Sequence, residues 1–353
     1  MALVTTVAKS HAEDRPAWLR AATIPCMALS GAAALAAVPL MHWAGVIIVP
    51  AGQQSLVFLA LLAGWLSVPP GLAVSALIGA GRAGCAATLT AASFLPPMSL
   101  LLASPTGSPP ADLLLGQILF GAVVAAVIVL RRSRAVNRLD LRRLLHFAPA
   151  GIAIGLLSPI AMVLARARVS DTLSWEHVAM IQAIWRANEW TTAVAAGMLY
   201  VHYLPRLGAA AGGQAFSRML ARAAAATLAP AALAMLALWL FLPQAIEWLY
   251  RPELVPSRAN AGFLLLGDFL RVVSWVFLYG LYARQVPRAV TIGEFLSIPL
   301  FALLLWFAAR PAGLWDVGQA WALTYLAYAT FNGLALRQSL HEETSVLAPQ
   351  RAP

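Results

Sequence analysis

The chain has 353 residues, of which 61% are hydrophobic and only 11% charged, and its mean hydropathy is +0.77. Because a soluble domain contains about 25% charged residues, this composition excludes a soluble globular protein and indicates a polytopic membrane protein. The net charge of +10 comes almost entirely from arginines, most of them in short loops between apolar stretches. We interpret them as contacts for anionic membrane lipid and expect no nucleic-acid partner. The two cysteines and six scattered histidines predict no disulfide, metal or cofactor site.

Ten stretches are long and apolar enough to cross the ~30 Å hydrocarbon core of a bilayer as helices. In chain order they are Trp18–Leu40, Leu56–Ile78, Cys85–Ser104, Leu113–Leu130, Phe147–Leu164, Met180–Pro205, Ala221–Leu242, Ala261–Tyr282, Ala289–Ala309 and Gly318–Leu336. Residues 1–17 are polar and predict no cleaved signal peptide. Prolines inside several spans, among them Pro69, Pro96 and Pro159, predict kinks because proline lacks a backbone N–H.

Loop charge predicts the orientation of these spans. Most basic residues fall on the side of the two chain ends and of the stretch Arg131–His146, whereas few fall on the opposite side. The opposite side holds Arg166, Arg168, Arg251, Arg258 and Arg310 in its loops, with Trp43, Trp175, Trp248 and Trp315 as interface anchors. By the positive-inside rule, both termini should be cytoplasmic, in a multi-pass protein of the bacterial inner membrane.

The long basic stretch divides the predicted spans into four and six. We expect an all-α protein with a four-helix N-terminal bundle over 1–130 and a cytoplasmic linker over 131–146. A six-helix C-terminal bundle over 147–337 and a cytoplasmic tail over 338–353 would follow. The loops on the outer side are short and leave no room for an extracytoplasmic catalytic domain, so we expect no enzyme.

Three spans carry ionisable residues well inside their apolar stretches. The sixth contains Arg186 and Glu189, the eighth Asp268 and Arg271, and the ninth Glu294. An ionised side chain near the bilayer centre costs about 2.5–3.5 kcal/mol even on lenient scales, so these groups must pair, be hydrated or be neutralised. The face of Arg186 and Glu189 continues as a stripe of polar and small residues: Gln182, Ala193, Ala196, Tyr200 and Tyr203.

Two interpretations of these charges stay open. In the first, Arg186–Glu189 and Asp268–Arg271 are ion pairs that fix helix packing. In the second, the arginines line a hydrated cavity and bind an anionic substrate, since guanidinium fits phosphate bidentately. Glu294 is then either a coupling site or a side chain that reaches interfacial water. The candidate substrate-binding residues are Arg186, Asn188, Arg271, Trp275 and Tyr200, and the candidate ion- or proton-coupling residues are Glu189, Asp268 and Glu294.

Several short motifs of the C-terminal half occur together in one order. They are Trp175-Glu176, the acid Glu189, Tyr203–Leu207, Leu266–Arg271 with Ser274-Trp275, Gly293-Glu294, and Gly318–Ala320 with Tyr325. With these motifs, residues 142–337 resemble the C-terminal half of Wzx-type flippases, which move lipid-linked oligosaccharides and belong to the superfamily of multidrug and toxic-compound extruders. Within the family the chain is most similar to flippases of the enterobacterial common antigen repeat, lipid III.

The resemblance implies a fold, an activity and partners. It implies a V-shaped transporter of two helical bundles, usually with twelve spans. This chain begins where the family's second span ends, so its N-terminal bundle is expected to be incomplete. The implied activity is translocation of undecaprenyl-pyrophosphate-linked repeat units of O-antigen, common antigen or exopolysaccharide by alternating access. A polysaccharide polymerase and a chain-length regulator are implied partners.

Three alternative functions stay open. One is a truncated paralogue that does not transport, and another is a drug or cation exporter of the same superfamily. The third is a membrane-embedded polysaccharide ligase or polymerase. The arginines within the spans disfavour a cationic substrate, and no loop carries clustered histidines and carboxylates at catalytic spacing.

Overall fold

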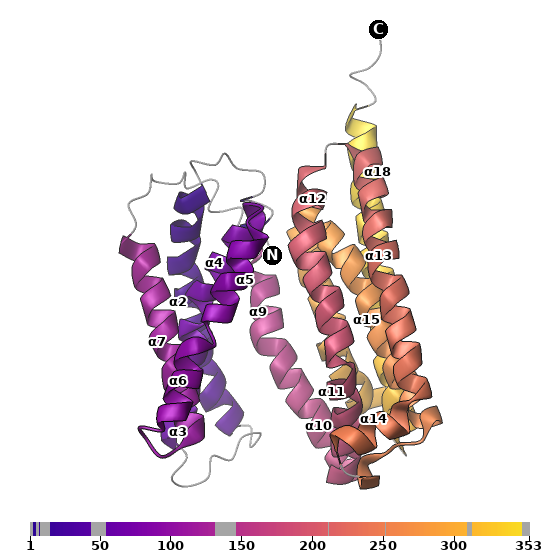
Figure 1. Ribbon diagram of the computed structural model, residues 1–353. Coiled ribbons are helices and arrows are strands. Elements are labelled where there is room, and N and C mark those ends of the chain that lie inside the picture. The colour runs from indigo at the N-terminus through magenta and orange to yellow at the C-terminus, as the bar shows by residue number, and fades with distance from the viewer. Residues whose placement is uncertain are drawn as a thin grey trace. The chain divides into compact units, whose positions relative to one another are not determined.

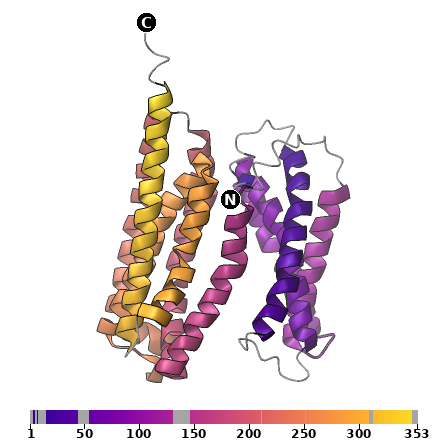
Figure 2. The same cartoon turned by 180° about the vertical axis from the view of Figure 1, so that it is seen from behind.

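The computed structural model describes residues 3–4, 7, 15–43, 54–130, 146–210, 212–250, 252–308 and 313–347. In these ranges the backbone is helical or in turns and forms no strand, which confirms the all-α prediction. The chain divides into two compact units, Met1–His146 and Phe147–Pro353 (Figures 1 and 2). The predicted linker 131–146, apart from His146, lies outside the described residues.

Each of the ten predicted spans falls on a helical segment. Among the described residues, seven segments are long and apolar enough to cross a membrane: Gln54–Gly79, Ala83–Ala103, Pro109–Leu130, Ala148–Thr172, Gly213–Leu240, Arg258–Arg284 and Pro287–Phe307. The first, sixth and tenth predicted spans are not among these seven. The sixth and tenth have a physical reason. Both carry buried polar side chains, such as Asn188 and Asn332, which lower their hydropathy.

The first unit consists of antiparallel helices that pack closely through small residues. Its helices are α2 (Arg15–Trp43), α3 (Gln54–Leu66), α4 (Val68–Gly79), α5 (Ala83–Ala92), α6 (Leu95–Ala103) and α7 (Pro109–Leu130). A Cβ atom on Gly121 of α7 would lie 2.1 Å from the carbonyl oxygen of Leu66, so only glycine permits this approach of α3. The indole of Trp65 donates to the carbonyl of Met27 over 2.8 Å and ties α3 to α2.

The second unit contains more helical segments than the first, and its candidate spans are more buried. Its segments are α9 (Ala148–Ile152), η1 (Ala153–Leu157), α10 (Ser158–Thr172), α11 (Trp175–Gly197), η2 (Met198–Tyr203), α12 (Leu204–Ala209), α13 (Gly213–Leu240), α14 (Leu242–Leu249), η3 (Pro252–Leu254), α15 (Arg258–Arg284), α16 (Pro287–Phe295), α17 (Ile298–Leu303), η4 (Leu304–Ala308) and α18 (Leu314–Leu347). Helices α15 and α18 pack along much of their length. Helix α13 and helix α11 pack on α15.

Proline sets the points where the spans are interrupted. Pro69 opens α4, Pro96 opens α6 and Pro159 opens α10, each within the first two positions of its helix. Proline is tolerated there because its missing N–H is one that the first helical turn leaves unpaired. The residues before Pro159 and Pro205 form π-helical turns, η1 and η2. These spans are therefore segmented at the prolines, as predicted.

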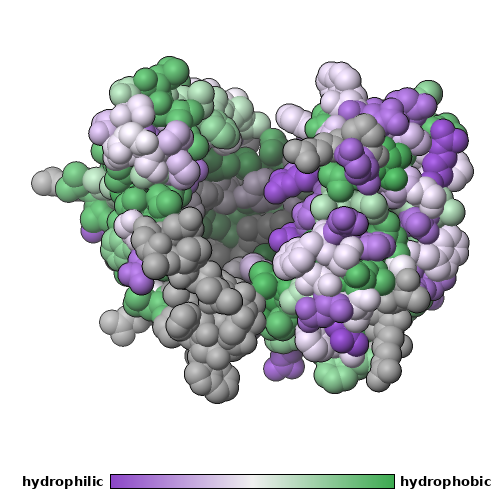
Figure 3. Space-filling view, turned by 90° about the horizontal axis from the view of Figure 1, so that it is seen from below, coloured by the Kyte–Doolittle hydropathy of each residue, from purple (hydrophilic) through white to green (hydrophobic). Residues whose placement is uncertain are grey.

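One end of the second unit carries exposed tryptophans. Trp175 at the start of α11, Trp248 in α14 and Trp315 at the start of α18 expose 71%, 86% and 40% of their surface. Viewed from the end that holds α14, hydrophilic side chains are interspersed with hydrophobic ones over this unit (Figure 3). Exposed indoles at helix ends are typical of the membrane–water interface. Trp43 is the last residue of α2 in the other unit.

Candidate functional site

A buried carboxylate, Asp268, joins three helices of the second unit. The side chain is 2% exposed, and its two oxygens accept from different helices. Asn188 Nδ2 of α11 donates to Oδ2 over 2.8 Å, and Trp321 Nε1 of α18 donates to Oδ1 over 3.1 Å. Gly267 makes room for the indole, because a Cβ atom there would lie 2.3 Å from Trp321 Cδ1. Asp268 thus holds α11 and α18 to α15 through neutral donors.

The predicted ion pair between Asp268 and Arg271 does not form. Among the described residues no salt bridge joins the two, although the charges are within electrostatic reach. The Arg271 guanidinium instead lies over the ring of Trp275, 4.7 Å from its centroid, and 5.9 Å from the centroid of Tyr325. Aromatic faces attract the cation and leave the edge of the guanidinium for hydrogen bonds.

Arg186 and Glu189 form the other predicted ion pair. Arg186 Nη1 lies 2.7 Å from Glu189 Oε2, and the two side chains are 63% and 57% exposed. Between them in sequence, Asn188 turns inward and is fully buried on Asp268. Arg186 and Asp268 each lie about 15 Å along their helices from the first residue, at ~1.5 Å per residue.

Glu294 is buried rather than directed to interfacial water. It is 6% exposed, and Tyr328 Oη donates to its Oε1 over 2.9 Å. The interpretation of Glu294 as a residue that reaches the interface is therefore wrong. Asn332, one helical turn beyond Tyr328, is fully buried and packs over Gly293, where a Cβ atom would lie 2.7 Å from Asn332 Oδ1.

A column of aromatic rings connects these polar groups. Trp321, Tyr325 and Tyr328 share one face of α18 and are at most 2% exposed. The centroids of Trp321 and Tyr325 are 4.7 Å apart, and those of Tyr325 and Tyr328 are 6.2 Å apart. At the other end, Trp185 lies 4.8 Å from Trp321. The column thus runs past Asp268, Arg271 and Glu294.

The remaining two candidates lie beside this column. Trp275 lies under the guanidinium of Arg271 and packs against the apolar cluster that includes Val272 and Met235. Tyr200, in η2, makes an edge contact with the buried Tyr279 of α15 at a centroid distance of 6.5 Å.

The sequence interpretation missed two arginines on α10. Arg166 and Arg168 were expected in a loop after a span ending near Leu164, but α10 continues to Thr172, so that boundary is wrong. The guanidinium of Arg168 lies 5.2 Å from the ring centroid of Trp306, and its Nε donates to the carbonyl of Leu305. The continuation of α10 beyond Leu164 could have been predicted from a spacing of four residues. Ala161, Ala165 and Val169 follow this spacing and form the buried face of the helix.

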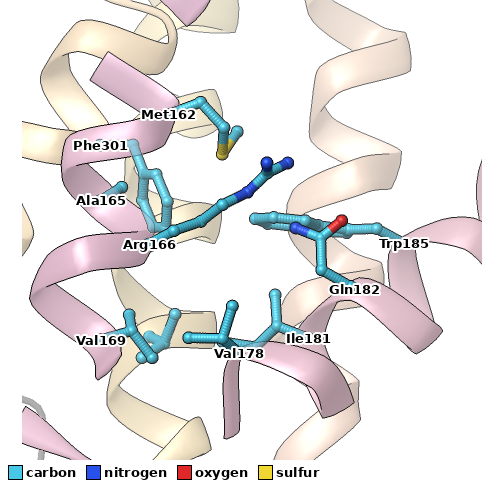
Figure 4. Close-up of a pocket in the computed structure, with 10 residues that line it drawn as sticks. Met162, Ala165, Arg166, Val169, Val178, Ile181, Gln182, Trp185 and Phe301 are labelled. Atoms are coloured by element: carbon cyan, nitrogen blue, oxygen red, sulfur yellow. The ribbon is translucent and has the colours of Figure 1, made fainter. Parts of the chain in front are cut away.

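Arg166 lies in a pocket between α10 and α11. The Gln182 side-chain oxygen, in the amide orientation that satisfies both partners, accepts from Arg166 Nε over 2.9 Å and Nη2 over 3.0 Å. Figure 4 shows the Arg166 side chain extending across the pocket toward Gln182 and Trp185, with Met162 and Phe301 beside it. The pocket is partly open to the surroundings.

The arrangement therefore combines several ionisable groups inside one helical unit: the four guanidinium groups of Arg166, Arg168, Arg186 and Arg271, and the three carboxylates of Glu189, Asp268 and Glu294. The carboxylates Asp268 and Glu294 are buried on hydrogen-bond donors, whereas Arg186 and Arg166 face outward or into a pocket. Chemically, such a unit can bind anions at its arginines and can hold protons or cations at its acids.

Comparison with known proteins finds partial similarity to named flippases. The chain matches no family model. Over 173 residues it is 26% identical to proteins named Lipid III flippase from Escherichia coli (strain K12) and from Shigella flexneri. That match covers 48% of this chain and 41% of each relative, so it spans less than half the length of the relatives.

Solved MATE structures share the fold. The crystal structure of MATE in the straight conformation has a TM-score of 0.74 at 15% identity, covering 98% of this chain and 84% of that chain. An outward-facing multidrug resistance MATE family transporter of the MOP superfamily has a TM-score of 0.69 at 14% identity, covering 98% of this chain and 85% of that chain. The matched proteins are flippases and transporters, as expected, and not enzymes. The chain is thus a multi-pass helical membrane protein with a MATE-like fold, and it resembles the Lipid III flippases.

Proposed function

We propose that this chain is a flippase that moves undecaprenyl-pyrophosphate-linked oligosaccharide repeats from the cytoplasmic to the outer leaflet of the inner membrane. The observation that carries the proposal is a set of arginines within membrane-depth helices, in a chain similar to Lipid III flippases. The substrate headgroup is anionic, and guanidinium binds phosphate bidentately. The repeat is that of common antigen, O-antigen or an exopolysaccharide, and translocation follows alternating access, with the lipid tail in the bilayer.

In this proposal the charged residues have separate roles. Arg186 and Arg271 contact the pyrophosphate, and Trp275 and Tyr200 flank the headgroup. Glu189 holds Arg186 until the substrate anion replaces it, and Asn188 positions Asp268. Asp268 and Glu294 are the coupling acids, because each is buried on donors of a neighbouring helix. Both chain termini are cytoplasmic, and a polymerase and a chain-length regulator receive the flipped repeat.

A drug exporter is the second candidate, because the solved structures with this fold include a multidrug resistance transporter. Many exported drugs are cations, and a cation would be repelled by the guanidinium groups of Arg166, Arg186 and Arg271. Binding measurements separate the two functions. A flippase binds polyprenyl pyrophosphate and ignores a lipophilic cation such as tetraphenylphosphonium, whereas an exporter of cations does the reverse.

Arginine replacements are expected to abolish flipping. Arg186→Gln and Arg271→Gln each remove a guanidinium that contacts the substrate, so the flipping rate should fall at least tenfold, equivalent to about 1.4 kcal/mol of lost interaction. Arg218→Gln, at an exposed site on α13, is the control and should leave the rate unchanged. If both α11 and α15 variants flip at the wild-type rate in stable protein, the arginines do not bind the substrate.

The replacement Glu294→Gln separates charge from hydrogen bonding. Glutamine keeps an acceptor for the Tyr328 hydroxyl, so the unfolding temperature should stay close to that of the wild type. Glutamine cannot exchange a proton, so ion-gradient-driven flipping should fall at least tenfold. The measurement is the flipping rate with and without an imposed gradient. Unchanged gradient stimulation in the variant would mean that Glu294 has only a packing role.

A genetic complementation experiment tests the proposed function. The full chain is expressed in cells that lack their lipid-linked repeat flippase, and surface polysaccharide is measured. We expect polysaccharide to reappear with the wild-type chain and not with the Arg186→Gln, Arg271→Gln double variant. Absence of polysaccharide in several such strains, each making a different repeat and with the protein present in the membrane, would contradict the proposal.

A further inference from the structure

Arg166 differs from the other arginines of the second unit in how its charge is balanced. Arg186 is paired with Glu189, and Arg271 lies on two aromatic rings within reach of the charge of Asp268. Among the described residues no salt bridge joins Arg166 to a carboxylate, and its side-chain partner is the neutral amide of Gln182.

A guanidinium group without a counter-ion raises the free energy of a membrane protein when it lies within a membrane helix. An arginine inside a membrane helix costs about 2.5–3.5 kcal/mol unless an anion or water compensates it. The Arg166 side chain nevertheless extends across the pocket rather than toward the ends of α10 (Figure 4). Apolar side chains, among them Met162, Trp185 and Phe301, line most of the pocket. Such surroundings strengthen the interaction of a cation with any anion that enters.

Gln182 fixes the orientation of Arg166. Its side-chain oxygen accepts from Nε and Nη2, so one edge of the guanidinium is already occupied. A guanidinium has five N–H donors, and the edge between Nη1 and Nη2 still has its own donors. That edge fits the two oxygens of one phosphate or one carboxylate. The neutral amide of Gln182 orients the arginine without neutralising it.

We propose that this α10–α11 pocket is an oxyanion subsite, in which Arg166 binds a phosphate or carboxylate group of the translocated headgroup and Gln182 is the positioning residue. The proposal deepens the proposed function and rests on it for the identity of the ligand. Arg186, within electrostatic reach of Arg166, extends the positive field from the pocket to the exposed Arg186–Glu189 pair. One anionic headgroup can therefore be bound at two points of α10 and α11.

Binding of defined anions to the purified full chain tests the subsite. The protein is reconstituted in phosphatidylcholine nanodiscs, which carry no net lipid charge, and binding is measured by calorimetry. The probes are inorganic pyrophosphate, undecaprenyl phosphate and glucuronate, with undecaprenol as the uncharged lipid. We expect Arg166→Gln to weaken binding of the anionic probe that fits the site at least tenfold, and Arg166→Lys to weaken it less. Undecaprenol binding should not change.

Arg168→Gln is the matched control, because Arg168 lies two residues along the same helix on Trp306 and outside the pocket lining. It should change anion affinity less than twofold. Gln182→Glu gives a second variant: the new carboxylate neutralises Arg166 and should lower anion affinity as much as Arg166→Gln. The subsite is overturned if Arg166→Gln binds every anionic probe within twofold of wild type, or if Arg168→Gln loses as much affinity.

The probes also identify the group that enters the pocket. Affinity for pyrophosphate and undecaprenyl phosphate with none for glucuronate assigns the phosphate of the lipid carrier, and the reverse assigns an acidic sugar. Either result supports the subsite. Arg166-dependent binding in a chain that fails every complementation test would overturn the proposed function and keep the anion site. Complementation by an Arg166→Gln chain at wild-type rate, with unchanged binding, would overturn the subsite and keep the proposed function.

Discussion

Replacing Gly267 with leucine is expected to destabilise the second unit by about 2–6 kcal/mol, one of the two largest effects expected for this chain. A Cβ atom at this position would lie 2.3 Å from Trp321 Cδ1 and 3.0 Å from the backbone nitrogen of Ala322. An aromatic ring in a packed helix interface cannot yield by that distance, so α15 and α18 must separate. Overpacking of this kind costs about 1–3 kcal/mol. Separation also breaks the hydrogen bond from Trp321 to Asp268, which adds about 1–3 kcal/mol.

Thermal unfolding of the purified chain in detergent measures this effect. Gly262→Ala is the control on the same helix, because a Cβ atom there meets only Trp239 Nε1 at 3.6 Å, an ordinary contact. Alanine is favoured over glycine inside a helix by about 1 kcal/mol, so this control should be neutral or slightly stabilising. Equal unfolding temperatures for the Gly267 and Gly262 variants would contradict the close packing of α15 on α18.

Asp268→Ala is expected to cost about 2–6 kcal/mol of stability, since two buried donors lose their acceptor at about 1–3 kcal/mol each. The donors are the amide of Asn188 and the indole of Trp321, which come from two other helices. Water inside the bundle cannot replace the carboxylate, because all three side chains are at most 2% exposed. The variant should therefore also loosen α11, which carries Arg186 two residues before Asn188.

The size of the stability loss in Asp268→Ala shows how much the hydrogen bonds around Asp268 contribute to the fold. Hydrogen bonds between membrane helices contribute about 0.6 kcal/mol each on average, because the separated helices find other partners. A stability loss near 1 kcal/mol for Asp268→Ala would mean that Asn188 and Trp321 find other hydrogen-bond partners in the variant. Asp268 would then not be essential for holding the three helices together. Asp268→Asn keeps an acceptor of the same shape and should lose less stability than Asp268→Ala in chemical denaturation of the same preparation.

The positions of the helices could be predicted from the sequence because apolar runs of bilayer length have one common structure. Proline similarly marked the breaks at Pro69, Pro96 and Pro159. The end of α10 could not be predicted in this way. Arg166 and Arg168 indicated a loop by their charge, but the first lies on Gln182 of α11 and the second on Trp306 of η4.

The partners within the candidate site depended on residues far apart in the chain. Spacing on one helix suggested that Asp268 pairs with Arg271, yet its oxygens accept from Asn188 and Trp321, which lie 80 and 53 residues away. The sequence spacing of Trp321, Tyr325 and Tyr328 predicts that they share one face of α18. That this face of α18 is directed toward Asp268 and Glu294 is known only from the packing of α18 on α15 and α16.

Translocation by the purified chain tests the flippase proposal most directly. The chain is reconstituted in liposomes with a fluorescent undecaprenyl-pyrophosphate-linked saccharide, and dithionite then destroys the label that is exposed in the outer leaflet. If the chain is a flippase, wild-type liposomes should lose the protected fraction of label over time, and liposomes with the Arg186→Gln, Arg271→Gln double variant should keep it. A protected fraction in wild-type liposomes equal to that of protein-free liposomes, with saccharides of several repeat types, would contradict the account.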